Sequence, residues 1–308
     1  MSAPTTLTGF AAALALAFGG AWALGSFVGP DAPAAAHGDA HASEATGEDA
    51  ASSDALPAGL ATSREGHTLD LTDDVLDAGT RQLAFAVRNA TGAPVTAFDV
   101  EHDKRLHLIV VRRDHTGFQH VHPVMDEEGT WRTEVDLAPG SWRVFADFTP
   151  TGGPALTLGT DLAVPGPTTT PPASAPTRTA KVDDGFEVSV TGDLRGGEHS
   201  TLRLQISRDG SPVTDLEPYL GAYGHLVALR EGDLGYLHVH PDGTPGDGHT
   251  PAGPAVDFTA EVPTVGRYHL YLDFKHGGVV RTAHLVLDAT PPSTTTTPSP
   301  AVPGGHGH

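Results

Sequence analysis

Histidine is the residue type through which this chain is best equipped to do chemistry. The 18 histidines equal the Lys and Arg residues combined, and there is no cysteine. The pattern HL-x11-HVHP occurs twice at identical spacing, within stretches that otherwise differ. Imidazole nitrogens favour copper, zinc or nickel, and the absence of thiolate excludes cysteine-based sites and argues against tight Cu(I) capture. We therefore predict a transition-metal ion, copper or zinc favoured, with six candidate ligands: His107, His120, His122, His225, His238 and His240.

A β-hairpin must position these side chains. Short apolar runs at 107–112 and 118–122 predict two strands, joined by a turn at 114–117. Successive side chains of a strand point to opposite faces, so His120 and His122 share one face.

The pairing register decides whether His107 joins that face. If Val111 pairs with Phe118, His107 lies opposite His122, whereas a slip of one residue would break the cluster. The core-facing residues of the hairpin are then Leu108, Val110 and Val121. The second copy predicts the same arrangement, with its three histidines outward and four apolar side chains inward: Leu226, Ala228, Leu237 and Val239.

Weaker candidate ligands stand nearby. The fourth ligand is water or an aspartate of a matched Asp-Phe pair, Asp147 in the first copy or Asp273 in the second. His276 and His102 are further histidines without a counterpart in the other copy. The opposing interpretation is a polar hairpin face whose histidines bond loop backbone, with HVHP serving as a structural turn.

The two motif copies belong to a tandem repeat. Aligning residues 94–123 with 212–241 without a gap makes eleven of 30 positions identical. We predict two domains, at 60–164 and 178–289, joined by a Pro/Thr-rich linker at 165–177. An acidic spacer (30–59) precedes them and a Pro/Thr-rich tail ending in His (290–308) follows, and both are predicted to be disordered.

Both copies predict an all-β fold. Short runs rich in Val, Leu, Phe and Thr alternate with Gly, Pro, Asn and Asp. About seven such runs in about 100 residues indicate a Greek-key β-sandwich, immunoglobulin-like or cupredoxin-like.

Charge and hydropathy indicate which partners the chain avoids and where in the cell it is located. The net charge of −20 argues against nucleic-acid binding. The stretch from Leu7 to Val28 contains no charged residue and is long enough to cross a bilayer. Residues 1–29 therefore predict a signal peptide or an uncleaved membrane anchor, with the anchor slightly favoured. Either interpretation places the rest of the chain outside the cytoplasm, tethered to the cell membrane or secreted.

The motifs resemble those of a group of exported actinobacterial proteins. These carry one or two β-domains with HL[IV]xxR…[FY]xHVHP, and a second-copy stretch like PVTDLEPYLGAYGHLVALR at 212–230. The resemblance covers about 60–289. Most members are uncharacterised and some are described as heavy-metal-associated, so it implies a metal-related role outside the membrane through the six motif histidines.

Three functions remain open at this point. The first is an extracytoplasmic metal-binding protein, acting in sequestration, delivery or resistance, and not an enzyme. The second is a cupin-type metalloenzyme, for which HVHPVMDE at 120–127 supplies His, His and a carboxylate, although the second copy lacks the carboxylate. The third is a surface scaffold or adhesion module that binds no metal. The sequence names no protein partner.

Overall fold

The computed structural model describes residues 56–169, 171–237 and 239–292. The predicted signal peptide or anchor at 1–29, nearly all of the spacer at 30–59 and nearly all of the tail at 290–308 lie outside the described residues, as does His238. Within the described part, no helix is long and apolar enough to span a membrane.

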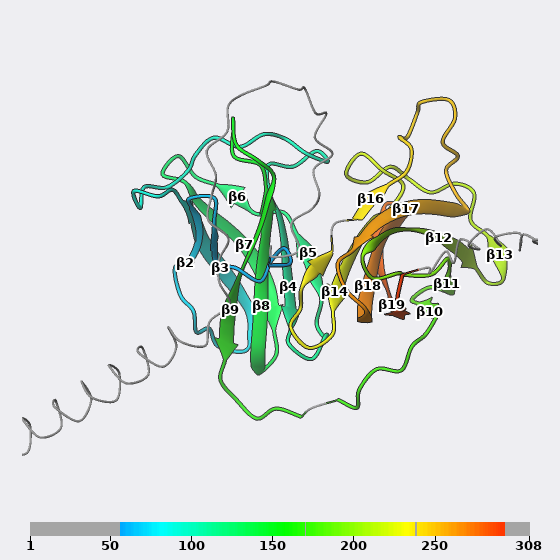
Figure 1. The fold of residues 1–308 in the computed structure, drawn as a ribbon, viewed down its shortest axis with the longest axis horizontal. Helices are drawn as coiled ribbons and strands as arrows, with labels where there is room; N and C mark the ends of the chain where they lie inside the picture. Colours follow the sequence, from blue (N-terminus) through cyan, green and yellow to red (C-terminus); the bar gives the residue numbers. More distant parts are fainter. Residues whose placement is uncertain (1–55, 170, 238, 293–308) are drawn as a thin grey trace, which may run out of the picture. The chain divides into compact units, whose positions relative to one another are not determined.

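The first domain is a sandwich of two antiparallel sheets (Figure 1). The five-stranded sheet has the order β1-β2-β3-β7-β6, made of Ser63–Arg64, His67–Leu71, Gly79–Arg88, Thr130–Leu137 and Val124–Met125. The four-stranded sheet has the order β5-β4-β8-β9, made of Gln119–Val121, His107–Arg112, Gly140–Phe148 and Leu156–Val164. Apolar side chains from the facing surfaces of these sheets form one core, with Phe85, Leu108 and Val144 fully buried in it.

The second domain repeats this plan. Its six-stranded sheet has the order β10-β11-β12-β17-β16 with β13 beside β12, made of Thr179–Val182, Phe186–Thr191, Glu198–Arg208, Ala255–Val262, Val239–Pro241 and Ser211–Pro212. Its four-stranded sheet has the order β15-β14-β18-β19, made of Tyr236–Leu237, His225–Arg230, Gly266–His276 and Val279–Ala289. The prediction of an all-β chain with two tandem β-sandwiches is confirmed.

The hairpin has the register assumed for it. Leu108 pairs with Val121 and Val110 with Gln119, which continues to the assumed pairing of Val111 with Phe118. Leu108 and Val110 face the core of the first domain. His120 lies across from Ile109 on the opposite face.

That opposite face is buried as well. A third apolar core joins the two domains, and it holds Ile109, Val111, Phe145, Val227, Leu229, Leu234 and Tyr271, with Phe118 and Tyr236 packed against it. Strands β4 and β14 are therefore buried on both faces, which explains their continuous apolar runs. In the second copy, His225 lies on the expected face, away from the core of its own domain, but it is only 9% exposed because the domains pack through these faces.

The contact between the domains has approximate two-fold symmetry. Phe118 of the first domain stacks on Tyr271 of the second, with ring centroids 4.0 Å apart. Tyr236 of the second domain packs on Phe145 of the first, at 5.7 Å. The repeat alignment matches Phe118 with Tyr236 and Phe145 with Tyr271, so each pair is the counterpart of the other.

Candidate metal centre

The three motif histidines of the first domain converge on one point. Nδ1 of His107 lies 3.1 Å from Nε2 of His120 and 3.3 Å from Nε2 of His122. One ligand atom from each ring falls within 4.8 Å of the other two. Strand β4 supplies His107, strand β5 supplies His120, and His122 follows directly after β5. The confirmed hairpin register is what brings the three rings together.

The outer partners of two rings determine which nitrogens carry protons. Nε2 of His107 lies 3.2 Å from the carbonyl oxygen of Glu101, and a carbonyl can only accept, so Nε2 carries the proton. Nδ1 of His120 donates in the same way to Oδ2 of Asp273 at 2.8 Å. In the neutral rings the inward atoms, Nδ1 of His107 and Nε2 of His120, therefore present lone pairs to each other.

Burial disfavours protonation of two of the three rings, His107 and His122. Desolvation and then neighbouring His120 lower the pKa of His107 from 6.5 to about 3. Desolvation and then His120 also lower the pKa of His122 to about 3. Two lone pairs facing each other without a proton repel, and a proton shared by two rings would leave the third inward nitrogen unpaired. One cation bound by all three rings removes both costs.

The spacing of the nitrogens fits a bound metal. Metal–nitrogen bonds of about 2.0–2.1 Å at a tetrahedral angle place two ligand nitrogens about 3.3 Å apart. The two contacts of His107 Nδ1, 3.1 and 3.3 Å, match this separation. Hydrogen bonds from the outer ring nitrogens to a carbonyl and a carboxylate are the usual support of metal-bound histidines. The His107/His120/His122 cluster could therefore hold a metal ion, with the fourth position left to another ligand.

A cavity of about 250 Å³ adjoins the cluster. It is lined by His107 and His120, and also by His102 and His225. The His102 and His225 rings meet edge to face, 5.1 Å apart. Nε2 of His225 donates to the carbonyl of Leu220 at 2.8 Å, which leaves its Nδ1 as a lone pair.

The other candidate ligands are distributed around this cavity. His240 also lines it, but it is exposed on β16 and pairs with β17 in the six-stranded sheet, so it is on a different sheet from His225. His238 lies outside the described residues. Asp273 contacts the ring of His120 through its second oxygen, and its first accepts from Thr282 Oγ1 at 2.5 Å.

Two weaker candidates have partners of their own. Asp147 accepts from Thr157 Oγ1 at 3.2 Å, and desolvation raises its pKa from 3.8 to about 6. His276 lies 3.2 Å from Asp215 Oδ1 and edge-on to Phe186, away from the cluster.

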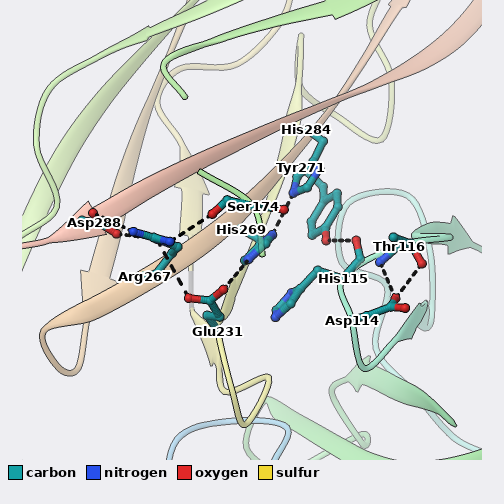
Figure 2. Close-up of polar contacts among 10 residues, drawn as sticks. All are labelled: Asp114, His115, Thr116, Ser174, Glu231, Arg267, His269, Tyr271, His284 and Asp288. Carbon is teal, nitrogen blue, oxygen red and sulfur yellow. Dashed lines mark hydrogen bonds and ion pairs between the residues drawn. The ribbon is translucent and has the colours of Figure 1, made fainter. Parts of the chain in front are cut away.

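Sequence reasoning missed a second group of histidines between the domains (Figure 2). His115, from the hairpin turn of the first domain, stacks on His269 of β18 with ring centroids 3.6 Å apart. Nδ1 of His269 lies 2.9 Å from Nε2 of His284 on β19. Tyr271 donates its hydroxyl to the carbonyl of His115 at 2.7 Å. None of the three histidines belongs to the repeated motif, so no sequence pattern marked them.

The second group contains buried ring nitrogens that have no hydrogen-bond partner in the part of the chain that the structure describes. Both ring nitrogens of His115, and Nε2 of His269, are buried without a hydrogen-bond partner among the described residues. Glu231 Oε1 stands 4.0 Å from Nε2 of His269, beyond hydrogen-bond reach. Desolvation lowers the pKa of His115 to about 4 and that of His269 to about 3, so these rings are neutral at pH 7.

Comparison with known proteins places the chain in a family. A family model described as Domain of unknown function (DUF8832) matches residues 61–165 and 180–291. The chain belongs to this family. Both β-sandwiches are copies of the family's domain, and the family description assigns no activity to them. No curated protein matches the chain.

Solved structures with some likeness include FdeC, an Escherichia coli adhesin. The match has 16% sequence identity, covers 77% of this chain and 66% of that chain, and has a TM-score of 0.24. A Salmonella alpha-2-macroglobulin matches at 14% identity, 76% of this chain, 15% of that chain and a TM-score of 0.26. Invasin, a bacterial integrin-binding protein, matches at 12% identity, 75% of this chain, 41% of that chain and a TM-score of 0.21. This chain spans less than two thirds of each of them, and at these TM-scores the matches carry no argument about its function.

Proposed function

We propose that this protein binds a transition-metal ion, copper or zinc, outside the cytoplasm, in sequestration, delivery or resistance. The ligands are His107, His120 and His122. The observation that carries the proposal is their convergence, because two of the three inward nitrogens are held as lone pairs by hydrogen bonds on the outer side of the ring. Imidazole nitrogen suits copper and zinc, and the chain offers no thiolate to compete.

The proposed location rests on the sequence. The uncharged run from Leu7 to Val28 supports a membrane tether or an export signal. The net charge of −20 would raise the local concentration of cations around such a protein.

A binding role fits the surroundings of the cluster better than cupin-type catalysis. The carboxylates that follow the HVHP motif do not reach the triad: Asp126 accepts from the backbone N–H of Thr130 at 2.8 Å, and Glu127 is exposed. A facial triad of two histidines and one carboxylate is therefore not assembled here by this segment.

Calorimetry with Zn(II) and with Cu(II) tests the proposal. The full chain is used with alanine in place of the four terminal-segment histidines: His37, His41, His306 and His308. We expect saturable binding that is lost when His107, His120 and His122 are changed to Ala. The matched control changes two exposed histidines of the second domain, His199 and His249, to Ala and should bind as the parent does. No saturable binding by the parent chain would refute the proposal and favour a scaffold that binds no metal.

A further inference from the structure

The second domain reaches into the candidate metal centre of the first. Asp273 on β18 accepts the Nδ1–H of His120 at 2.8 Å, across 153 residues of sequence. The side chains of His120 and Asp273 are 5% and 3% exposed, so this contact is shielded from water. Thr282 donates to the other oxygen of Asp273 at 2.5 Å and fixes the carboxylate in place. A group from one domain therefore orients a candidate ligand of the other.

This contact selects the form of His120 that can bind metal. A free imidazole exchanges its proton between the two nitrogens, and only the form with the proton on Nδ1 presents Nε2 as a ligand. The carboxylate of Asp273 accepts from Nδ1–H and so favours that form. Outer partners of this kind are worth about 10–100-fold in metal affinity. Asp273 is thus a positioning residue, which acts on the metal through His120.

A second group from the same domain stands beside the open position. The His225 ring lies 6.2 Å from the ring of His107 and 6.3 Å from that of His120. Within the triad the ring centroids are 5.3, 5.0 and 4.9 Å apart, so the His225 ring centroid is about 1 Å farther out than the triad rings are from one another. Its Nε2–H is engaged by the Leu220 carbonyl, which leaves Nδ1 as a free lone pair.

We propose that the metal is shared between the two domains, with Asp273 holding His120 in its ligand form and His225 supplying the fourth ligand. This inference rests on the proposed function. The bound ion then acts as a clamp across the contact between the domains. A ligand that binds only the docked arrangement stabilises it by RT ln(1 + [L]/Kd), so metal supply regulates how firmly the domains stay together.

The apolar contact makes this arrangement available before metal arrives. The third core buries side chains of both domains next to the cluster, including Ile109 and Val227. The stacked pair of Phe118 and Tyr271 adds an aromatic contact at 4.0 Å. The ion therefore meets a preassembled pocket, in which His225 moves toward the triad to complete the coordination.

Zn(II) calorimetry and Co(II) absorption on the full chain test this inference, in the background with the four terminal-segment histidines replaced. We expect Asp273→Asn to weaken Zn(II) binding by about 10–100-fold with one site retained. We expect His225→Ala to weaken binding and to change the visible Co(II) spectrum, because one nitrogen ligand is replaced by water. The matched control is Asp257→Asn, the same substitution on another strand of the second domain, which should change the affinity by less than about threefold because Asp257 bonds Arg203 and does not line the cavity beside the triad.

Amide hydrogen exchange adds a measurement that would not change if His225 had only a structural role. Zn(II) should slow exchange in β14 of the second domain as well as in β4 of the first, and His225→Ala should abolish the effect in β14 only. Parental affinity and spectrum in both Asp273→Asn and His225→Ala, with binding lost in His107→Ala, would overturn the shared site and leave the proposed function standing. A loss of affinity in Asp257→Asn equal to that in Asp273→Asn would also overturn it. Absence of binding by the parent chain would refute the function and the inference together.

Discussion

Acid should weaken the fold through the histidines between the domains, and His115 allows the effect to be isolated. Its ring is 6% exposed, and neither ring nitrogen has a hydrogen-bond partner among the described residues. Desolvation, followed by the charge of His284, lowers its pKa from 6.5 to about 4, although Asp114 opposes the shift. The perturbation is His115→Phe, which keeps an aromatic ring against His269 but cannot take up a proton.

The magnitude follows from proton linkage. The folded-state pKa is depressed, so this stability is fully present above about pH 6.5 and is lost as the pH falls toward about 4. Between about pH 6.5 and about pH 5 the unfolded ring takes up a proton and the folded one does not, at about 1.4 kcal/mol per pH unit, or about 2 kcal/mol in all. The ring lines a cavity, so solvent screening reduces this to about 1 kcal/mol for His115.

Urea unfolding of the wild type and the variant at about pH 7.5 and about pH 5 measures the effect as a double difference. His115 has a positive φ of 65°, so Phe there has a backbone cost, but that cost is the same at both pH values and cancels. The variant should lose about 1 kcal/mol less than the wild type on acidification. His199→Phe on the exposed face of β12 is the control and should follow the wild type. Equal losses in wild type and His115→Phe would refute the reasoning.

Three further predictions concern single positions. Tyr271→Phe removes a hydroxyl that donates to a backbone carbonyl of the first domain at 2.7 Å, and should lower the free energy of unfolding by about 1 kcal/mol in urea titrations, whereas Tyr271→Ala should cost at least about 3 kcal/mol. Gly159→Ala would place Cβ 2.0 Å from the carbonyl oxygen of Gly59 and should lower the free energy of unfolding by about 3 kcal/mol or more. An unchanged midpoint in chemical denaturation would contradict this. Zn(II) at about 100 times its Kd should raise the free energy of unfolding by about 2.7 kcal/mol, and a calorimetric scan of His107→Ala should show no such gain.

The sequence was sufficient to predict the sandwich fold and the triad within one hairpin. Alternation along the strands places His120 and His122 on one face, and the register assumed for the hairpin, which the structure has, brings His107 to His120. These are local relationships, encoded within sixteen residues from His107 to His122. The same local logic extends to the cores of each domain, where alternate residues of long strands such as β12 are buried.

The docking of the two domains was not predictable by the same route. The partner of His120 is Asp273, 153 residues away, and no periodic pattern links the two. One signal was present: Ile109 and Val111 are as apolar as the core residues Leu108 and Val110 that alternate with them, which indicates a strand buried on both faces. That signal shows that the outer face is covered, but it does not identify what covers it.

The reciprocal aromatic pairs have a consequence for chains that carry a single copy of this domain. The repeat alignment turns one pair into the other, as in a two-fold homodimer whose halves have been linked end to end. A one-copy relative with the same aromatic residues would leave this apolar face in water until a second molecule covered it. Such a chain should therefore assemble in pairs, with two equal sites, whereas the fused chain is free to let its two halves specialise.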